Sequence, residues 1–283
     1  MESYIDLHIH TCKSDGIYTP SEIVKMASKK KLKAIAITDH DTVDGLNEAS
    51  IEAQKLDIEF INGIEINTNF GDGQLHMLGY FINPSSQAIK SFLEDTKKSR
   101  YKVFIKWLLK LNRYGIRVST DELNKHQFSM NQDGIIDYMI LKKYVNSKEQ
   151  ALKEYFDVGG KLFIQRDKPT PEQAIKIIKQ SGGIAVLAHP FRSIKHKPLN
   201  ELVSELVSYG LNGIECYHSE QPKEIVLESS ELVKQYNLVV TGGSDFHGNE
   251  KTNVQLGAGY GNLPIQMDIL KNLKKHRNCE GIM

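Results

Sequence analysis

The chain has 283 residues, with 36 Lys and Arg against 35 Asp and Glu, which gives a formal net charge of +1. A balanced charge excludes the protein-wide positive field that attracts long nucleic acids or anionic membranes, so we expect neither as a partner and any phosphate recognition to be local. No uncharged apolar run approaches the roughly 18 residues that a membrane span requires. The composition, 40% hydrophobic and 25% charged, is typical of a globular protein with one large α/β barrel or two ordinary domains.

The cysteines and the amino terminus indicate the cellular compartment. Cys12, Cys216 and Cys279 are too few and too scattered for a disulfide framework. The amino-terminal segment has neither the basic residues nor the apolar core of a signal peptide. A reducing cytoplasm is therefore the expected location.

Predicted strands and helices alternate at both ends of the chain, which is the pattern of parallel α/β architecture. A strand is expected at 4–10, and Thr19 with Pro20 then predicts the start of a helix by N-capping. In the second half, Thr170 with Pro171 predicts another helix, which stops at Gly182 and Gly183. The other predicted strands are 34–38, 58–66, 75–82, 184–188, 211–217 and 238–241.

Residues 84–166 break this alternation and predict an inserted helical subdomain between 1–83 and 167–283. The segment is largely helical in period, rich in Lys and Tyr, and contains no clustered ligand candidates. Two apolar stripes occur in it, and core packing is the favoured interpretation of both. They comprise Ile105, Leu108, Leu109 and Leu111 near Trp107, and Ile135, Ile136, Met139, Ile140 and Tyr144.

The most informative motif is the pair of histidines at His8 and His10. In a strand, side chains two residues apart point to the same face, so both imidazoles can converge on one metal ion while Leu7 and Ile9 pack behind them. Further His, Asp and Glu residues close other apolar segments along the chain. Together the candidate metal ligands, which are also the candidate catalytic residues, are His8, His10, Asp15, His40, Glu65, His76, His189, Asp245 and His247.

Nine nitrogen and oxygen ligands without a cysteine are too many for one ion. A tetrahedral zinc uses three or four, whereas two or three ions sharing a bridging carboxylate would use them all. Mixed imidazole and carboxylate sets suit Mn, Fe or Zn. The candidates also close strands, where an α/β barrel places its active site. The sequence therefore predicts a centre of two or three divalent ions.

Clustered divalent ions favour the hydrolysis of a phosphate ester. They lower the pKa of a water molecule and neutralise charge on a phosphoryl oxygen during in-line displacement. The chain has no nucleophilic serine elbow, no glycine-rich dinucleotide fingerprint and no GxxxxGK[ST] loop. Acyl transfer, hydride transfer and nucleotide-powered work therefore have no support.

Six linked motifs resemble the polymerase and histidinol phosphatase (PHP) superfamily of metal-dependent phosphoesterases. They are the HxH of His8 and His10, Thr38-Asp39-His40-Asp41, Glu65, His76, Ala188-His189-Pro190 and Gly242-Gly243-Ser244-Asp245-Phe246-His247. The resemblance implies a distorted (β/α)7, TIM-like barrel formed by 1–83 and 167–283, with a trinuclear metal centre. In the family's pattern, one ion is held by His8, His10, Glu65 and Asp245, a second by Glu65, His76 and His189, and a third by Asp15, His40 and His247.

The long insertion resembles that of a bacterial branch of the superfamily that acts on nucleoside 3′,5′-bisphosphates and short oligoribonucleotides. The resemblance implies hydrolysis of a phosphomonoester by a metal-bridging hydroxide. The branch commonly carries an Arg-Pro-His sequence, which the corresponding residues 131–135 lack. Alternative substrates are a nucleoside monophosphate, histidinol phosphate or a cyclic sugar phosphate. Alternatives of other classes are a non-catalytic metal-binding PHP module and an amidohydrolase-type enzyme, whose carboxylated lysine would here be replaced by Glu65.

Three further residues are candidates for binding the phosphorylated substrate. Arg192 lies three residues after His189, and Arg166 lies at the exit from the insertion. Arginine offers a planar fork that matches phosphate oxygens, although a surface ion pair is an equal interpretation for Arg166. His218 could protonate a leaving group or act as a hydrogen-bonded structural residue. We expect a small nucleotide as the ligand and no obligate protein partner.

Overall fold

The structure, a computed structural model, describes residues 4–70, 73–193, 197–248, 254–257 and 265–279. The chain divides into two compact units. Residues 1–93 and 169–283 form the barrel unit, and residues 94–168 form the helical unit. No helix in the described ranges is both long and apolar enough to cross a membrane.

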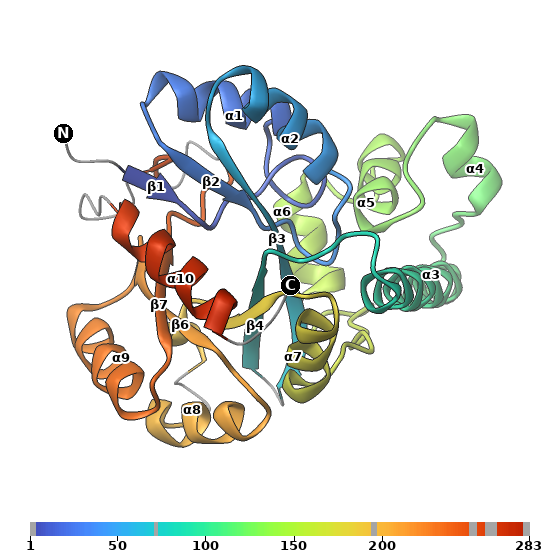
Figure 1. Cartoon of the computed structure of the whole chain (residues 1–283). Coiled ribbons are helices and arrows are strands. Elements are labelled where there is room, and N and C mark those ends of the chain that lie inside the picture. The colour runs from blue at the N-terminus through green and yellow to red at the C-terminus, as the bar shows by residue number, and fades with distance from the viewer. Residues whose placement is uncertain (1–3, 71–72, 194–196, 249–253, 258–264, 280–283) are drawn as a thin grey trace. The chain divides into compact units, whose positions relative to one another are not determined.

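The barrel unit is built on one sheet, with its strands in the order β7-β6-β5-β4-β3-β2-β1-β8 (Figure 1). The strands are β1 (Tyr4–Asp6), β2 (Ala34–Ile37), β3 (Glu59–Phe70), β4 (Gly73–Tyr80), β5 (Ile184–Leu187), β6 (Gly213–His218), β7 (Val239–Gly243) and β8 (Ile265–Gln266). The segments after β1 and β7 meet, because the His10 N–H donates to Phe246 C=O at 3.0 Å and the Asp245 N–H donates to His8 C=O at 2.9 Å. The sheet thus closes into the predicted distorted, TIM-like barrel.

Strand β4 runs against its neighbours, which is the main departure from a regular α/β barrel. It pairs antiparallel with both β3 and β5, whereas β1, β2 and β3, and likewise β5, β6 and β7, pair in parallel. Only two residues separate β3 from β4. A parallel pairing needs a crossover of a dozen or more residues, so a connection of this length permits only a hairpin.

Helices cover the barrel strands. They are α1 (Pro20–Lys29), α2 (Leu46–Lys55), the first part of α3 (Gln87–Arg113), α7 (Pro171–Gln180), α8 (Leu199–Ser208), α9 (Lys223–Gln235) and α10 (Met267–Cys279). Both predicted helix starts are confirmed as capping boxes, with Thr19 and Glu22 beginning α1 and Thr170 and Gln173 beginning α7.

The two faces of the strands pack into different cores. On β3, Ile64 and Ile66 belong to a core shared with α1, α2, α7 and α8, whereas Ile61 belongs to a second core shared with α10. Strand residues two apart share a face, so Glu65 and Gly63 lie on the same side as Ile61, the side away from α1 and α2. Alternation along β3 therefore directs one carboxylate into the barrel.

The helical unit has its own hydrophobic core. Its elements are the remainder of α3, α4 (Thr120–Lys125), α5 (Gln132–Leu141), α6 (Lys148–Ala151) and a π-helical turn (Leu152–Phe156). Leu108, Leu111 and Met139 are buried in this core, as the stripes predicted. The predictions for Leu109 and Tyr144 are wrong, since their exposed fractions are 59% and 41%. Leu109 lies on the outer side of α3, and Tyr144 lies beyond the end of α5.

Candidate metal centre

All nine predicted ligands gather in one cluster at one end of the barrel. Each has a side-chain nitrogen or oxygen within 3.5 Å of another member. Most follow strands: His8, His10 and Asp15 follow β1, His40 follows β2, His189 follows β5, and Asp245 and His247 follow β7. The prediction that all nine lie at carboxyl ends of strands is wrong for Glu65 and His76, which lie inside β3 and β4. Because β4 is antiparallel, its amino-terminal half reaches the end of the barrel where the parallel strands finish.

Glu65 is the centre of the cluster. Its Oε1 lies 2.9 Å from His76 Nδ1 and 2.9 Å from His189 Nε2. Its Oε2 lies 3.3 Å from His8 Nε2, 3.1 Å from His10 Nε2 and 3.1 Å from His40 Nδ1. One buried carboxylate therefore contacts five imidazoles from four segments of the chain.

Asp245 is the second carboxylate of the cluster. Its Oδ1 lies 3.1 Å from His10 Nε2 and 3.4 Å from His8 Nε2. Its Oδ2 faces the other way, toward His218 Nε2 at 3.3 Å and the Arg192 guanidinium at 3.2 Å. Asp245 thus links the HxH histidines to two of the predicted substrate-binding residues.

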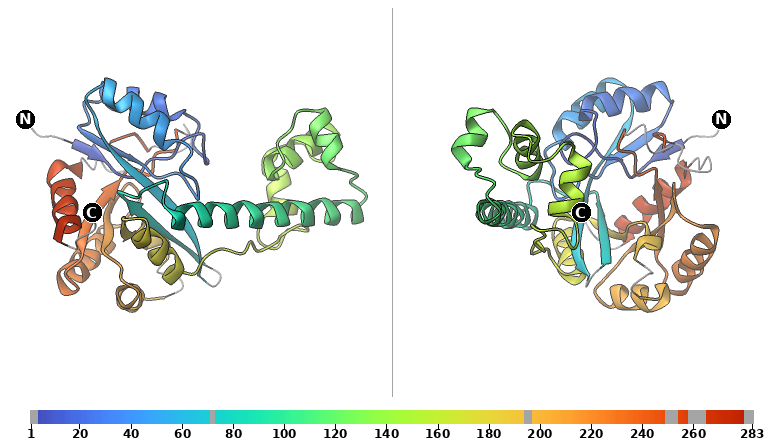
Figure 2. Two further views of the ribbon diagram at one scale, coloured as in Figure 1. Left: turned by 45° about the vertical axis from the view of Figure 1, so that its right-hand side comes forward. Right: turned by 180° about the vertical axis from the view of Figure 1, so that it is seen from behind.

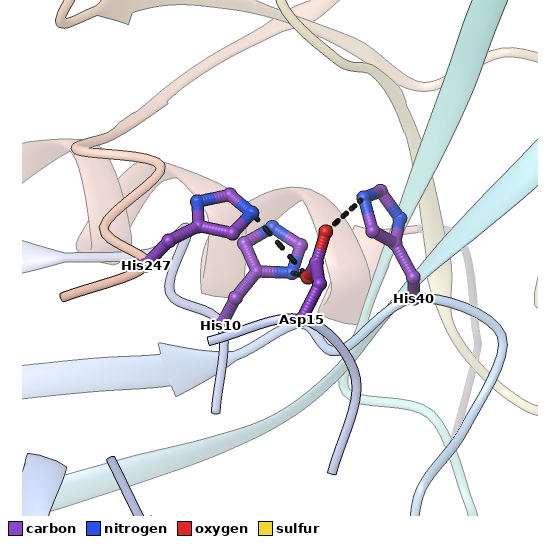
Figure 3. Close-up of side chains that lie close together, drawn as sticks. All are labelled: His10, Asp15, His40 and His247. Carbon is purple, nitrogen blue, oxygen red and sulfur yellow. Dashed lines mark ion pairs between the residues drawn. The ribbon is translucent and has the colours of Figure 1, made fainter. Parts of the chain in front are cut away.

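Asp15 contacts three histidines in the outer part of the cluster (Figure 3). Its carboxylate lies 3.4 Å from His247 Nε2, 3.5 Å from His10 Nδ1 and 3.8 Å from His40 Nε2. The Asp15 side chain is 53% exposed, whereas that of Glu65 is 1% exposed. The cluster therefore runs from a buried floor to the solvent.

The carboxylates raise the pKa values of the two HxH histidines. Burial lowers the pKa of His10, but hydrogen bonds and charge from Asp245 and Glu65 outweigh it and raise this pKa to about 10. The pKa of His8 is also raised, because the charges of Glu215, Glu65 and Asp245 outweigh burial. In return, the pKa values of Glu65 and Asp245 are lowered despite burial.

Two other imidazoles are neutral. Burial is the largest cause that lowers the pKa of His40 and of His189 to about 4. Among the residues that the structure describes, Nδ1 of His10, His40 and His189 is buried and forms no hydrogen bond of acceptable geometry, although carboxylate oxygens lie near Nδ1 of His10 and of His40. Neutral imidazole nitrogens beside ionised carboxylates are the donor set that divalent Mn, Fe and Zn take.

The donor set therefore fits metal ions. Buried charges occur where they are paired or coordinate a metal, and here buried carboxylates face imidazole nitrogens that divalent ions take as ligands. Ligand atoms within 4.8 Å of one another form four overlapping groups: His8, His10, Glu65 and Asp245; His10, Asp15, His40 and His247; His40, Glu65 and His76; and His8, Glu215 and His218.

Glu215, a buried residue of β6, is the functional candidate that sequence reasoning missed. Its Oε1 lies 2.8 Å from His8 Nδ1, and its Oε2 accepts the His189 backbone N–H at 2.7 Å. A hydrogen bond at Nδ1 leaves Nε2 of His8 facing Glu65 and Asp245. The sequence did contain a signal for Glu215, which is the one carboxylate within the predicted buried strand 211–217. A buried strand does not tolerate an unpaired charge, so a partner was to be expected.

Other buried aspartates position the ligand-bearing loops. Asp39 accepts hydrogen bonds from the Thr11 N–H at 2.7 Å, the Thr11 hydroxyl at 2.7 Å and the Ser14 hydroxyl at 2.6 Å, which fixes the loop that carries Asp15. Asp6 accepts from the N–H and hydroxyl of Ser244, next to Asp245. These contacts tie each ligand loop to a neighbouring strand end.

Three of the non-glycine residues with positive φ angles lie in or beside the ligand-bearing loops. Asp41, His189 and Asp245 adopt positive φ angles of 51°, 25° and 58°. Such conformations cost about 1–3 kcal/mol each for residues other than glycine and persist where the surroundings hold them. The His189 N–H donates to the Glu215 carboxylate, and the Asp245 N–H donates to the His8 C=O. These two hydrogen bonds hold the backbone at His189 and Asp245.

The three predicted substrate-binding residues have different surroundings. Arg192 lies at the cluster, where its guanidinium also contacts Glu220 at 2.9 Å and the Phe191 ring. His218 is buried, and its Nδ1 accepts the Glu220 N–H at 3.1 Å, so its Nε2 carries the proton that faces Asp245. Arg166 belongs to the helical unit.

Comparison with known proteins decides the family. The model of the PHP domain matches residues 6–169, more than half of the chain. The chain belongs to the PHP domain family. This confirms the resemblance seen in the sequence.

Three PHP relatives from bacteria match almost the whole chain. A 5′-3′ exoribonuclease of Haemophilus influenzae is 30% identical over 87% of this chain and 91% of its own length. A phosphoribosyl 1,2-cyclic phosphate 1,2-diphosphodiesterase of Eggerthella lenta is 28% identical over 86% and 94%. A 3′,5′-nucleoside bisphosphate phosphatase of Chromobacterium violaceum is 27% identical over 86% and 87%.

A solved structure gives the same result for the fold. A protein of Bifidobacterium adolescentis, described as a candidate metal-dependent phosphoesterase, superposes with a TM-score of 0.78. The two are 26% identical, and the match covers 97% of this chain and 96% of the other. The chain is therefore a metal-dependent phosphoesterase of the PHP family, and the prediction of a hydrolase is confirmed.

Proposed function

We propose that this PHP phosphoesterase hydrolyses a phosphomonoester of a small nucleotide, either a nucleoside 3′,5′-bisphosphate or the end of a short oligoribonucleotide. The observation that carries the proposal is the contact of Glu65 with five imidazoles, since a buried carboxylate surrounded by imidazole nitrogens is a donor set that divalent ions take. The exoribonuclease and the bisphosphate phosphatase among the relatives support this substrate class.

The nine clustered residues are proposed to hold two or three ions of Mn, Fe or Zn. Glu65 would be shared between two ions, with His8, His10 and Asp245 on one side and His76 and His189 on the other, while Asp15, His40 and His247 would hold a third. Bound divalent ions supply an activated water and neutralise phosphoryl charge in this class of reaction.

The remaining residues of the site orient the substrate and the ligands. Arg192 lies beside Asp245 and is partly exposed, so its guanidinium can turn from Glu220 toward a substrate phosphate. His218 donates its Nε2 proton toward Asp245, which fixes that carboxylate. We therefore propose His218 as a positioning residue for Asp245, and Arg192 as the phosphate ligand. Arg166 remains a second candidate for phosphate binding.

Phosphate release from purified, Mn-loaded protein tests the proposal. The panel contains a nucleoside 3′,5′-bisphosphate, a short oligoribonucleotide, a nucleoside monophosphate, histidinol phosphate and a cyclic sugar phosphate. We expect the first two to give the highest kcat/KM. A clear preference for one of the other three would overturn the substrate assignment but not the enzyme class.

Two Glu→Gln variants on one strand test the metal centre. Glu65→Gln should abolish turnover and reduce bound metal, because an amide loses charge toward two ions. Glu59→Gln is the matched control, because Glu59 lies on the same strand, β3, and forms an ion pair only with Lys274 of α10 among the residues that the structure describes. This variant should retain both turnover and bound metal. Arg192→Ala should weaken binding of a bisphosphate more than that of a monophosphate, because only the bisphosphate has a second anion to pair.

A further inference from the structure

The near-zero charge of the whole chain conceals an asymmetry between its two units. Residues 94–168 carry 16 Lys and Arg against 10 Asp and Glu, a formal net charge of +6. The rest of the chain carries 20 against 25, a net charge of −5. The helical unit is therefore a basic module attached to an acidic enzyme.

The positive charge is ordered along one face of α3, which runs as a single continuous helix (Figure 2). Lys98, Lys102, Lys106, Leu109 and Arg113 follow one another at intervals of three or four residues and so form one stripe. All five are exposed, and the stripe extends for about 22 Å at 1.5 Å per residue. We call these five residues the α3 stripe.

The α3 stripe faces away from the core of the helical unit. Phe104, Leu108 and Leu111 of the same helix are buried in that core, and their positions on the helix are opposite those of the stripe. The stripe is therefore a surface of the unit and is not required for its packing.

Most cations of the α3 stripe have no partner. Lys98 contacts Asp95 at 3.5 Å, but Lys102, Lys106 and Arg113 form no ion pair with any residue that the structure describes. Elsewhere exposed lysines do pair, as Lys148 does with Asp133 at 2.7 Å. Like charges at i and i+4, such as Lys98 with Lys102 and Lys102 with Lys106, destabilise a helix. An anionic ligand along the stripe would relieve this repulsion.

Exposed apolar side chains accompany the cations. Leu109 lies within the stripe and has an exposed fraction of 59%. Tyr101 borders the stripe, three residues after Lys98, and has an exposed fraction of 58%. Alternation of cations with exposed aromatic or apolar groups suits single-stranded nucleic acid, whose phosphates pair with the cations while its bases stack on the rings. An acidic protein segment would use the cations but has less use for an exposed tyrosine.

We infer that the α3 stripe binds the backbone of single-stranded RNA. The inference rests on the proposed function in assigning RNA, but it concerns a surface outside the metal centre. It agrees with the expectation that phosphate recognition is local, because the positive charge is confined to one unit of the chain.

Binding of a labelled oligouridylate of about 15 nucleotides to the full chain tests the inference. Fluorescence anisotropy is measured in EDTA, which prevents hydrolysis, over a series of salt concentrations. The triple variant Lys102→Gln, Lys106→Gln and Arg113→Gln should bind roughly tenfold more weakly. Its slope of log K against log salt should fall by about 2, because each lost phosphate contact on a single strand contributes about 0.7.

The control variant removes the same charge from the barrel unit. Lys29→Gln, Lys30→Gln and Lys31→Gln neutralise an exposed basic run at the end of α1 and should leave RNA binding and its salt slope unchanged. Both triple variants, once loaded with Mn, should hydrolyse a nucleoside bisphosphate as the wild type does.

Three results would overturn the inference. They are unchanged RNA affinity and slope in the α3 variant, equal losses in the two triple variants, and binding of polyglutamate as tight as that of RNA. Failure of the wild type to hydrolyse any nucleotide would instead contradict the proposed function, because RNA binding is measured without turnover.

Discussion

Replacing Glu215 by Gln is expected to weaken metal binding while leaving the fold intact. The carboxylate accepts two hydrogen bonds, from His8 Nδ1 at 2.8 Å and from the His189 N–H at 2.7 Å. A glutamine has one acceptor oxygen, so only one of these bonds can persist. The backbone N–H cannot change its role, and the amide oxygen is therefore expected to stay with His189.

The consequence falls on His8. The glutamine NH2 would then face Nδ1 of His8, which favours the tautomer with its proton on Nε2. That proton would lie toward Glu65 and Asp245. It would block the Nε2 lone pair, through which His8 is proposed to bind a metal ion. Loss of an outer hydrogen-bond partner of this kind typically reduces metal affinity or activity 10- to 100-fold. If His8 instead kept its proton on Nδ1, two donors would face each other, at a cost of about 1–3 kcal/mol of stability.

The assay is a titration of the metal-free enzyme with Mn, read as phosphate release. We expect the Mn concentration for half-maximal activity to rise by about 10- to 100-fold in the variant. Glu224→Gln, at an exposed position in α9, is the control and should titrate as the wild type. An unchanged activation midpoint in Glu215→Gln would refute the reasoning that Glu215 sets the tautomer of His8.

Four further predictions follow from the same structure. Glu65→Gln should reduce turnover more than His40→Ala, because Glu65 contacts five imidazoles, and the reverse order in kcat would contradict its shared role. Removal of metal by a chelator should lower the thermal midpoint in scanning fluorimetry, since an ion at 100 times its Kd stabilises the fold by about 2.7 kcal/mol; equal midpoints would argue against a structural contribution. Asp6→Asn should cost about 1–3 kcal/mol in urea unfolding, because its amide would face the N–H of Ser244 or Gly257, and no change would show that the pocket adapts. Replacing residues 94–168 by a short linker should raise KM for the nucleotide far more than it alters turnover of p-nitrophenyl phosphate, and equal effects on both would exclude a role in substrate selection.

Much of the fold was predictable because its signals are local. The helix starts at Thr19 and Thr170 were predicted from an N-cap threonine followed by proline, and the capping boxes observed there also lie within four residues. Strand alternation likewise places His8 and His10 on one side, since the period of two is a property of extended backbone. The ends of the predicted strands differ from those observed, and the short strand β8 was not predicted.

The direction of β4 and the exposure of Leu109 needed the tertiary structure. A hydrophobic pattern has no direction, so the strand at 75–82 was predicted without its antiparallel pairing. An apolar stripe on a helix likewise does not determine how wide the buried face of that helix will be. Leu109 lies outside the buried face of α3.

The sequence by itself determined the types of ligand and their order along the chain, and these were sufficient to predict a phosphoesterase. The tertiary structure alone decided which carboxylate is central and which residues support it. Glu215 lies 207 positions from His8 and joins no recognisable motif, yet the two are bonded. Parallel strands brought together by barrel closure create such pairs, and no local pattern encodes a contact between segments so far apart in the chain.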